Sequence, residues 1–165
     1  MTKTFTAALT LQVRDEGAFE LDDPASDLLP EFADQLDSGA TPVTVRHLLN
    51  HTSGVIDFLE VYDPFDIDSY PESLEVLLDR MATEPLLFTP GTRYHYSNTG
   101  YLYLGRITEA ITGQSWETAL AERILDPLEL NQTWLTAPAN RGDLATGYLP
   151  IEGFVLPVSR FGRPD

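Results

Sequence analysis

Cysteine is absent from this 165-residue chain, lysine occurs once, and no apolar run approaches the length of a membrane span. Without cysteine the chain cannot form disulfides or thiolate metal sites. The absence does not identify a compartment, because exported proteins can also lack cysteine. No signal peptide is recognisable near the start, so we expect a cytoplasmic protein as given, or an exported one if truncation removed a leader.

Positive charge is also scarce. Lys and Arg total 10 against 26 Asp and Glu, which gives a formal net charge of −16. A field of this sign repels nucleic-acid phosphates and anionic lipid, so neither a nucleic-acid partner nor membrane insertion is expected. The single lysine and the abundant aspartate leave a high-salt source as an open interpretation.

Apolar side chains recur at helical spacing in five stretches, which are residues 2–16, 43–50, 71–81, 98–113 and 115–126. In the first stretch Phe5, Leu9 and Val13 fall on one line. Ala8 and Leu11 widen that line to more than half of the circumference, which indicates a helix covered from several sides. We expect Asn98 to cap the fourth helix.

Two regions lack this periodicity. Residues 55–70 are aromatic and acidic, which favours a long loop near a cleft entrance. Towards the carboxyl end, short β-like runs at 144–149 and 154–158 flank a turn at 150–153, a pattern typical of a hairpin.

Two sets of side chains raise the question of a metal ion. Asp63, Asp66 and Asp68 suggest a calcium loop but lack its glycine and final glutamate, so a solvated acidic loop is favoured. His47 and His51 are four residues apart and could share a helical face, but no third ligand stands at a suitable spacing. The sequence therefore predicts no metal site and no cofactor.

Five segments in register resemble one family. They are M-T-K-T-F-T-A at 1–7, L-D-D-P at 21–24, R-H-L-L-N-H-T-S-G at 46–54, P-G-T-R-Y-H-Y-S-N-T-G-Y at 90–101 and D-P-L at 126–128. The chain resembles the beta-lactamase-related serine hydrolases, which include class C beta-lactamases, D-alanyl-D-alanine carboxypeptidases and esterases. The resemblance implies an α+β, beta-lactamase/transpeptidase-like fold. Residues 1–165 would form a single partial domain, mainly its helical part, with four or five helices and a short hairpin.

The resemblance also assigns roles to three residues. Lys3 matches the lysine of the S-x-x-K motif, while Tyr96 and Asn98 match the tyrosine and asparagine of the Y-x-N motif. Lys3 and Tyr96 would be the catalytic residues that activate a serine, and Asn98 would bind substrate. The expected substrate is a small-molecule or peptide acyl compound: a beta-lactam, a D-amino-acid peptide or a small ester. In this family His51 is expected to be structural.

Two parts of the family pattern are missing. The motif serine would stand three positions before Lys3, and the K-T-G or H-x-G strand would follow the Y-x-N motif. We therefore expect a fragment truncated at both ends and inactive as the isolated chain. The alternative is a catalytically dead binding or interaction module. The first helix is expected to be covered by sheet strands, of which this chain holds few. Its uncovered apolar area predicts self-association through exposed apolar faces.

Overall fold

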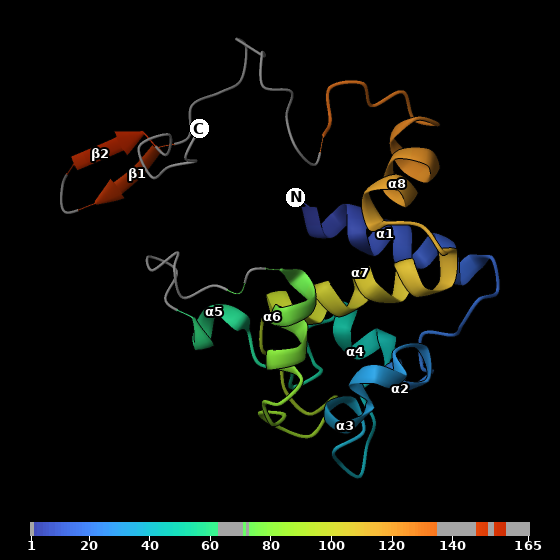
Figure 1. Ribbon diagram of the computed structural model, residues 1–165, viewed down its shortest axis with the longest axis vertical. Coiled ribbons are helices and arrows are strands. Elements are labelled where there is room, and N and C mark those ends of the chain that lie inside the picture. The colour runs from blue at the N-terminus through green and yellow to red at the C-terminus, as the bar shows by residue number, and fades with distance from the viewer. Residues whose placement is uncertain (1, 63–70, 72, 135–147, 152–153, 158–165) are drawn as a thin grey trace. The chain divides into compact units, whose positions relative to one another are not determined.

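The computed structural model describes residues 2–62, 71, 73–134, 148–151 and 154–157 (Figure 1). The chain divides into two compact units, residues 1–131 and residues 132–165. The helices of the first unit are α1 (Thr2–Asp15), α2 (Ala25–Leu28), α3 (Ala33–Leu36), α4 (Val45–Leu49), α5 (Phe58–Val61), α6 (Leu74–Met81), α7 (Asn98–Thr112) and α8 (Trp116–Leu120). A 3-10 turn, η1 (Pro30–Phe32), precedes α3, and a π-helical turn, η3 (Ala121–Leu125), follows α8.

The two long helices, α1 and α7, pack against each other and organise the first unit (Figure 1). A glycine with a left-handed backbone follows each helix: Gly17, at φ 82°, two residues after the end of α1, and Gly113, at φ 68°, directly after α7. Among the described residues no helix is long and apolar enough to cross a membrane.

The buried face of α1 differs from the predicted one. Leu9 and Val13 are buried as expected, but Ala8 is exposed, and Thr6 and Thr10 are buried in its place. The two threonines satisfy their hydroxyls by donating to carbonyls one turn earlier in the helix. Hydrophobicity alone therefore misplaced the edge of the buried stripe.

The main core lies around the middle of α7. It is built by fourteen buried residues: Val13, Phe19, Ala25, Leu29, Phe32, Leu36, Val43, Val45, Leu48, Val55, Leu78, Tyr103, Leu104 and Ile107. A smaller cluster joins Leu9 of α1 to Ala119, Leu120 and Ile124. No large apolar side chain of α1 is among the exposed ones, so the expected exposure of this helix is not found within residues 2–15. Self-association stays a prediction.

All five predicted helices correspond to observed ones: α1, α4, α6, α7, and α8 continued by η3. The third begins later than expected, at Leu74, because Ser73 accepts a hydrogen bond from Val76 N–H as its N-cap. Residues 58–61, predicted to be loop, form the one-turn helix α5. Asp63, Asp66 and Asp68 lie outside the described residues.

In the second unit, strand β1 (Tyr148–Ile151) pairs antiparallel with β2 (Phe154–Pro157). Tyr148 lies opposite Pro157, and Ile151 opposite Phe154. Pro150 and Ile151, expected in the turn, belong to β1, while residues 144–147 of the predicted first run lie outside the described residues.

Candidate active site

The side chains of Lys3, Tyr96 and Asn98 meet at one point. Lys3 Nζ donates to Asn98 Oδ1 at 2.6 Å, and the Tyr96 hydroxyl donates to the same oxygen at 3.2 Å. The lysine comes from the first turn of α1, and the other two come from the residues that lead into and begin α7. The packing of α1 on α7 therefore brings together residues that are more than ninety positions apart.

Asp57 contacts the other end of the Asn98 amide. Asn98 Nδ2 donates to Asp57 Oδ2 at 2.7 Å. A lysine can only donate and a carboxylate can only accept, so both neighbours require the same orientation of the amide. The result is a continuous chain of polar contacts from Lys3 through Asn98 to Asp57.

Within the described part of the chain, the contacts of the Lys3 ammonium are to neutral groups. It lies 5.1 Å from the ring centroid of Tyr96 and 5.4 Å from that of Tyr101, both within cation–π range. Among the described residues Lys3 forms no ion pair with a carboxylate, although the chain carries 26 acidic residues. An amide oxygen and two ring faces hold an ammonium less strongly than a carboxylate would.

His51 packs between two of these tyrosines. Its ring centroid is 4.6 Å from that of Tyr96 and 5.1 Å from that of Tyr101, and both interplanar angles are 33°. Its Nδ1 accepts a hydrogen bond from Ser97 N–H at 3.1 Å, which leaves the proton of the neutral ring on Nε2. Burial, and then the charge of Lys3, lower the pKa of His51 below 6.5, which favours that neutral form.

The two tyrosines that flank His51 differ in their chemistry. The Tyr101 hydroxyl donates to Leu49 O at 3.1 Å, and burial, with a smaller contribution from Tyr96, raises the pKa of Tyr101 above 10.0. Tyr101 is therefore suited to hold structure in its protonated form. The Tyr96 side chain is 45% exposed and reaches the same oxygen as Lys3, so it is the phenol that an incoming substrate can meet.

The H-T-S-G segment at 51–54 supports the backbone before Tyr96. Leu87 N–H donates to Gly54 O, and His95 N–H donates to His51 O, each at 2.8 Å. Gly54 has φ 79°, and a Cβ at this position would lie 2.5 Å from Phe88 O. Only glycine allows this approach of the two backbones.

The structure corrects the expected cap of α7 and adds detail on the two histidines. Ser97, not Asn98, caps α7, since its Oγ accepts from Gly100 N–H, while Asn98 is the first helical residue. His47 Nδ1 accepts from Thr44 N–H within the capping box of α4, so His47 and His51 both bind backbone. No group of three or more potential ligands that could hold a metal occurs among the residues that the structure describes.

Sequence reasoning missed Asp57. It stands three residues after the H-T-S-G segment, in a stretch interpreted as loop, and its partner Asn98 is 41 positions away. The one local signal was its suitability as an N-cap, since Asp57 Oδ1 accepts from Leu59 N–H at the start of α5.

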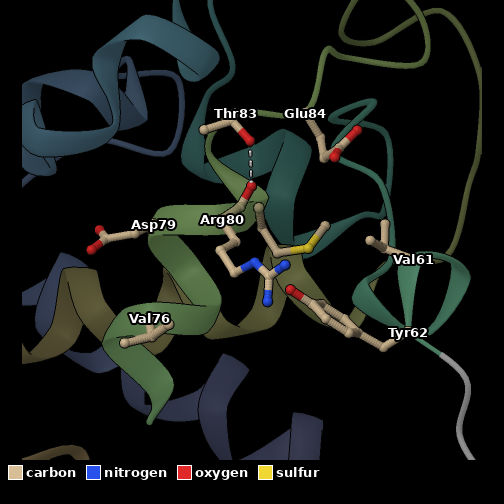
Figure 2. Close-up of a pocket in the computed structure, with 8 residues that line it drawn as sticks. Val61, Tyr62, Val76, Asp79, Arg80, Thr83 and Glu84 are labelled. Atoms are coloured by element: carbon tan, nitrogen blue, oxygen red, sulfur yellow. Dashed lines mark hydrogen bonds between the residues drawn. The ribbon is translucent and has the colours of Figure 1, made fainter. Parts of the chain in front are cut away.

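A hollow of about 450 Å³ is lined by residues at the end of α5, on α6 and in the turn after α6 (Figure 2). The guanidinium of Arg80 lies 5.5 Å from the ring centroid of Tyr62 within it. Lys3, Tyr96 and Asn98 are not among the lining residues, so the hollow is not the site described above.

Comparison with known proteins identifies the family. The model of the beta-lactamase family matches residues 1–154. The chain belongs to the beta-lactamase family. It is 39% identical over 139 residues to penicillin-binding protein 4 of Amycolatopsis lactamdurans, covering 84% of this chain and 35% of that protein. It is 35% identical over 140 residues to the esterase EstB of Burkholderia gladioli, covering 78% of this chain and 35% of the esterase.

Solved structures agree with this assignment. The octameric penicillin-binding protein homologue from Pyrococcus abyssi matches with a TM-score of 0.77 and 31% identity, covering 94% of this chain and 37% of that one. The beta-lactamase/transpeptidase-like fold and membership of this serine hydrolase superfamily are thus established for the chain. It spans about a third of the length of the two relatives.

Proposed function

We propose that this chain carries the proton-transfer side of a serine acyl-transfer site, with Lys3 and Tyr96 catalytic and Asn98 binding substrate. One observation carries the proposal: Lys3 Nζ and the Tyr96 hydroxyl converge on the same oxygen of Asn98. The shared acceptor holds these two titratable groups beside each other, and positioned titratable side chains are what proton transfer to or from a reacting group requires.

The reaction we propose has two steps. When one member of the Lys3–Tyr96 pair is deprotonated, it takes the proton of a serine hydroxyl while the serine oxygen forms a bond to the acyl carbon, and the pair then protonates the departing amine or alkoxide. Water then cleaves the acyl ester: it gives a proton to the pair as its oxygen bonds to the acyl carbon, and the pair returns a proton to the departing serine oxygen. The S-x-x-K spacing requires a serine three positions before Lys3, and no residue of the sequence occupies that position. Residues 1–165 alone are therefore proposed to be inactive.

Asn98 would contribute to substrate binding through its amide nitrogen. Nδ2 carries two protons, and Asp57 accepts one of them. The second proton is available to a carbonyl oxygen of the acyl substrate. The printed names of the relatives, a penicillin-binding protein and an esterase, support a beta-lactam, a D-amino-acid peptide or a small ester as the substrate.

The test uses the product of the complete open reading frame, assayed with a fluorescent penicillin and a p-nitrophenyl ester. We expect Lys3→Ala and Tyr96→Phe each to lower the acylation rate by about 10²–10⁴-fold, the usual contribution of a positioned proton-transfer group. Tyr94→Phe is the matched control, because Tyr94 is 68% exposed and contacts only the edge of His51 in the aromatic contacts described. Its rate should equal that of the parent.

Two results would reject the proposal. Acylation of Lys3→Ala at the parental rate would show that the amine takes no part in the reaction. Reversible binding of the penicillin by the parent, with no covalent adduct and no ester turnover, would support the binding module in place of the hydrolase.

A further inference from the structure

Asp57 is a buried carboxylate in contact with the candidate active site, and its side chain has a role beyond capping. The residue is 6% exposed. Its two oxygens divide their work: Oδ1 accepts from Leu59 N–H at 3.1 Å, and Oδ2 accepts from Asn98 Nδ2 at 2.7 Å. One oxygen therefore caps the N-terminus of α5, and the other binds Asn98 in the candidate active site.

The second contact reinforces the orientation of the Asn98 amide that Lys3 also requires. Asn98 Oδ1 accepts from both Lys3 and Tyr96, which uses both of its lone pairs. If the amide rotated by half a turn, Nδ2 would face the Lys3 ammonium, and Oδ1 would face the Asp57 carboxylate. A donor would then face a donor at Lys3, and an acceptor would face an acceptor at Asp57. A carboxylate at position 57 therefore disfavours the rotated amide.

The backbone around Asp57 is held independently of this contact. The Ser97 hydroxyl donates to Ile56 O at 3.4 Å, and Phe58 N–H donates to Thr99 Oγ1 at 2.9 Å. Three successive residues, 56–58, thus bind three successive residues, 97–99. The contact of Asp57 with Asn98 is the middle one, and its two neighbours can keep the segments in register when it is removed.

We propose that Asp57 is a positioning residue, which fixes the Asn98 amide so that its oxygen faces Lys3 and Tyr96. The catalytic consequence rests on the function proposed above. The orientation itself does not, and it can be measured on residues 1–165.

The variant that separates the two tasks is Asp57→Ser. Serine is as good an N-cap as aspartate, so the start of α5 should persist, but its single shorter oxygen cannot also serve Asn98. Thr99→Val is the matched control. It removes the neighbouring contact to Phe58 N–H at similar volume and leaves the contact between Asp57 and Asn98 in place.

The readout is the side-chain ammonium of Lys3. Because Lys3 is the only lysine, a sample labelled with ¹⁵N-lysine gives one ammonium signal, and its proton exchange with water can be measured by NMR. We expect Asp57→Ser to accelerate this exchange by about tenfold, the factor that loss of one hydrogen bond of ordinary strength produces. Thr99→Val should exchange at the parental rate.

An unchanged exchange rate in folded Asp57→Ser would overturn the proposal, as would equal acceleration in Thr99→Val. If Asp57→Ser lacks a cooperative thermal transition, the isosteric Asp57→Asn replaces it. Its one oxygen cannot serve both Leu59 N–H and Asn98 Nδ2, so faster exchange of the Lys3 ammonium is again expected and parental exchange would overturn the proposal.

The activity assay adds a second readout on the complete reading-frame product. Misorientation of Asn98 removes the acceptor shared by Lys3 and Tyr96, so kcat of Asp57→Ser for the p-nitrophenyl ester should fall more than KM rises, whereas Thr99→Val should keep both values. If the parent itself shows no acyl transfer, the proposed function fails, and the ammonium exchange still decides the role of Asp57.

Discussion

The first turn of α7 and its middle belong to one helix but do different work. At the start, Asn98 is half-buried, and its amide contacts an ammonium, a phenol and a carboxylate. Further along the helix, Tyr103, Leu104 and Ile107 are fully buried in the main core. The core residues fix where the helix lies, and the first turn uses that fixed position to present polar groups. Stability and chemistry should therefore respond to different substitutions.

The largest effect on stability is expected in the middle of α7. Leu104→Ala should lower the free energy of unfolding by about 2–5 kcal/mol, because it removes a fully buried side chain from the main core and leaves a cavity. Leu128→Ala makes the same chemical change at a side chain that is 64% exposed and should cost less than about 0.5 kcal/mol. Denaturant titration of residues 1–165 measures both, and similar costs would contradict the placement of the core.

A smaller effect is expected at the N-cap of α7. Ser97→Ala removes the N-cap of α7 and should cost about 1 kcal/mol in the free energy of unfolding. Because Ser97 directly precedes Asn98, the same change should also accelerate exchange of the Lys3 ammonium. Ser115→Ala removes the exposed N-cap of α8 and should leave that exchange unchanged. If the Lys3 ammonium exchanged at the same rate in both variants, the N-cap of α7 would have no part in positioning Asn98.

The smallest effect concerns pH. The pKa of His51 lies below 6.5 in the folded chain, so the unfolded chain binds more protons near that pH. The stability that neutral His51 contributes is complete above about pH 6.5 and is lost as the pH falls through 6.5 towards the folded pKa. His51→Asn keeps a residue that tolerates φ 57° and should flatten the fall in Tm between about pH 7.5 and 5.5.

Part of this slope should remain in His51→Asn. Burial also lowers the pKa of His47, which is present in both proteins. Thermal melts across the pH range give the comparison, and identical slopes for parent and variant would show that His51 is not the group responsible.

The contrast within α7 also shows what the sequence could predict. Periodicity located the long helices because α1 and α7 repeat their apolar positions over several turns. It could not find the four-residue helices α2, α3 and α5, since one turn is too short to repeat a pattern. The buried Thr6 and Thr10 were missed because their hydroxyls are satisfied inside the helix, which no hydropathy scale records.

The candidate active site also contains residues that the sequence predicted and one that it did not. The meeting of Lys3 with Tyr96 and Asn98 followed from the family resemblance, and no local property of these residues would have paired them across the chain. Asp57 could not be predicted, because a carboxylate among 26 acidic residues is not distinguished by its type. Its role depends on a contact across 41 positions that only the packed structure reveals.

The most direct test of the central claim is peptide mapping of the covalent adduct that a fluorescent penicillin forms with the complete reading-frame product. Trypsin cleaves after Lys3, so we expect the adduct on a serine in the tryptic peptide that ends at Lys3, and no adduct in Lys3→Ala on the longer peptide that then ends at Arg14. An adduct on any serine within residues 1–165 would contradict the account, because the nucleophile would then belong to a different site.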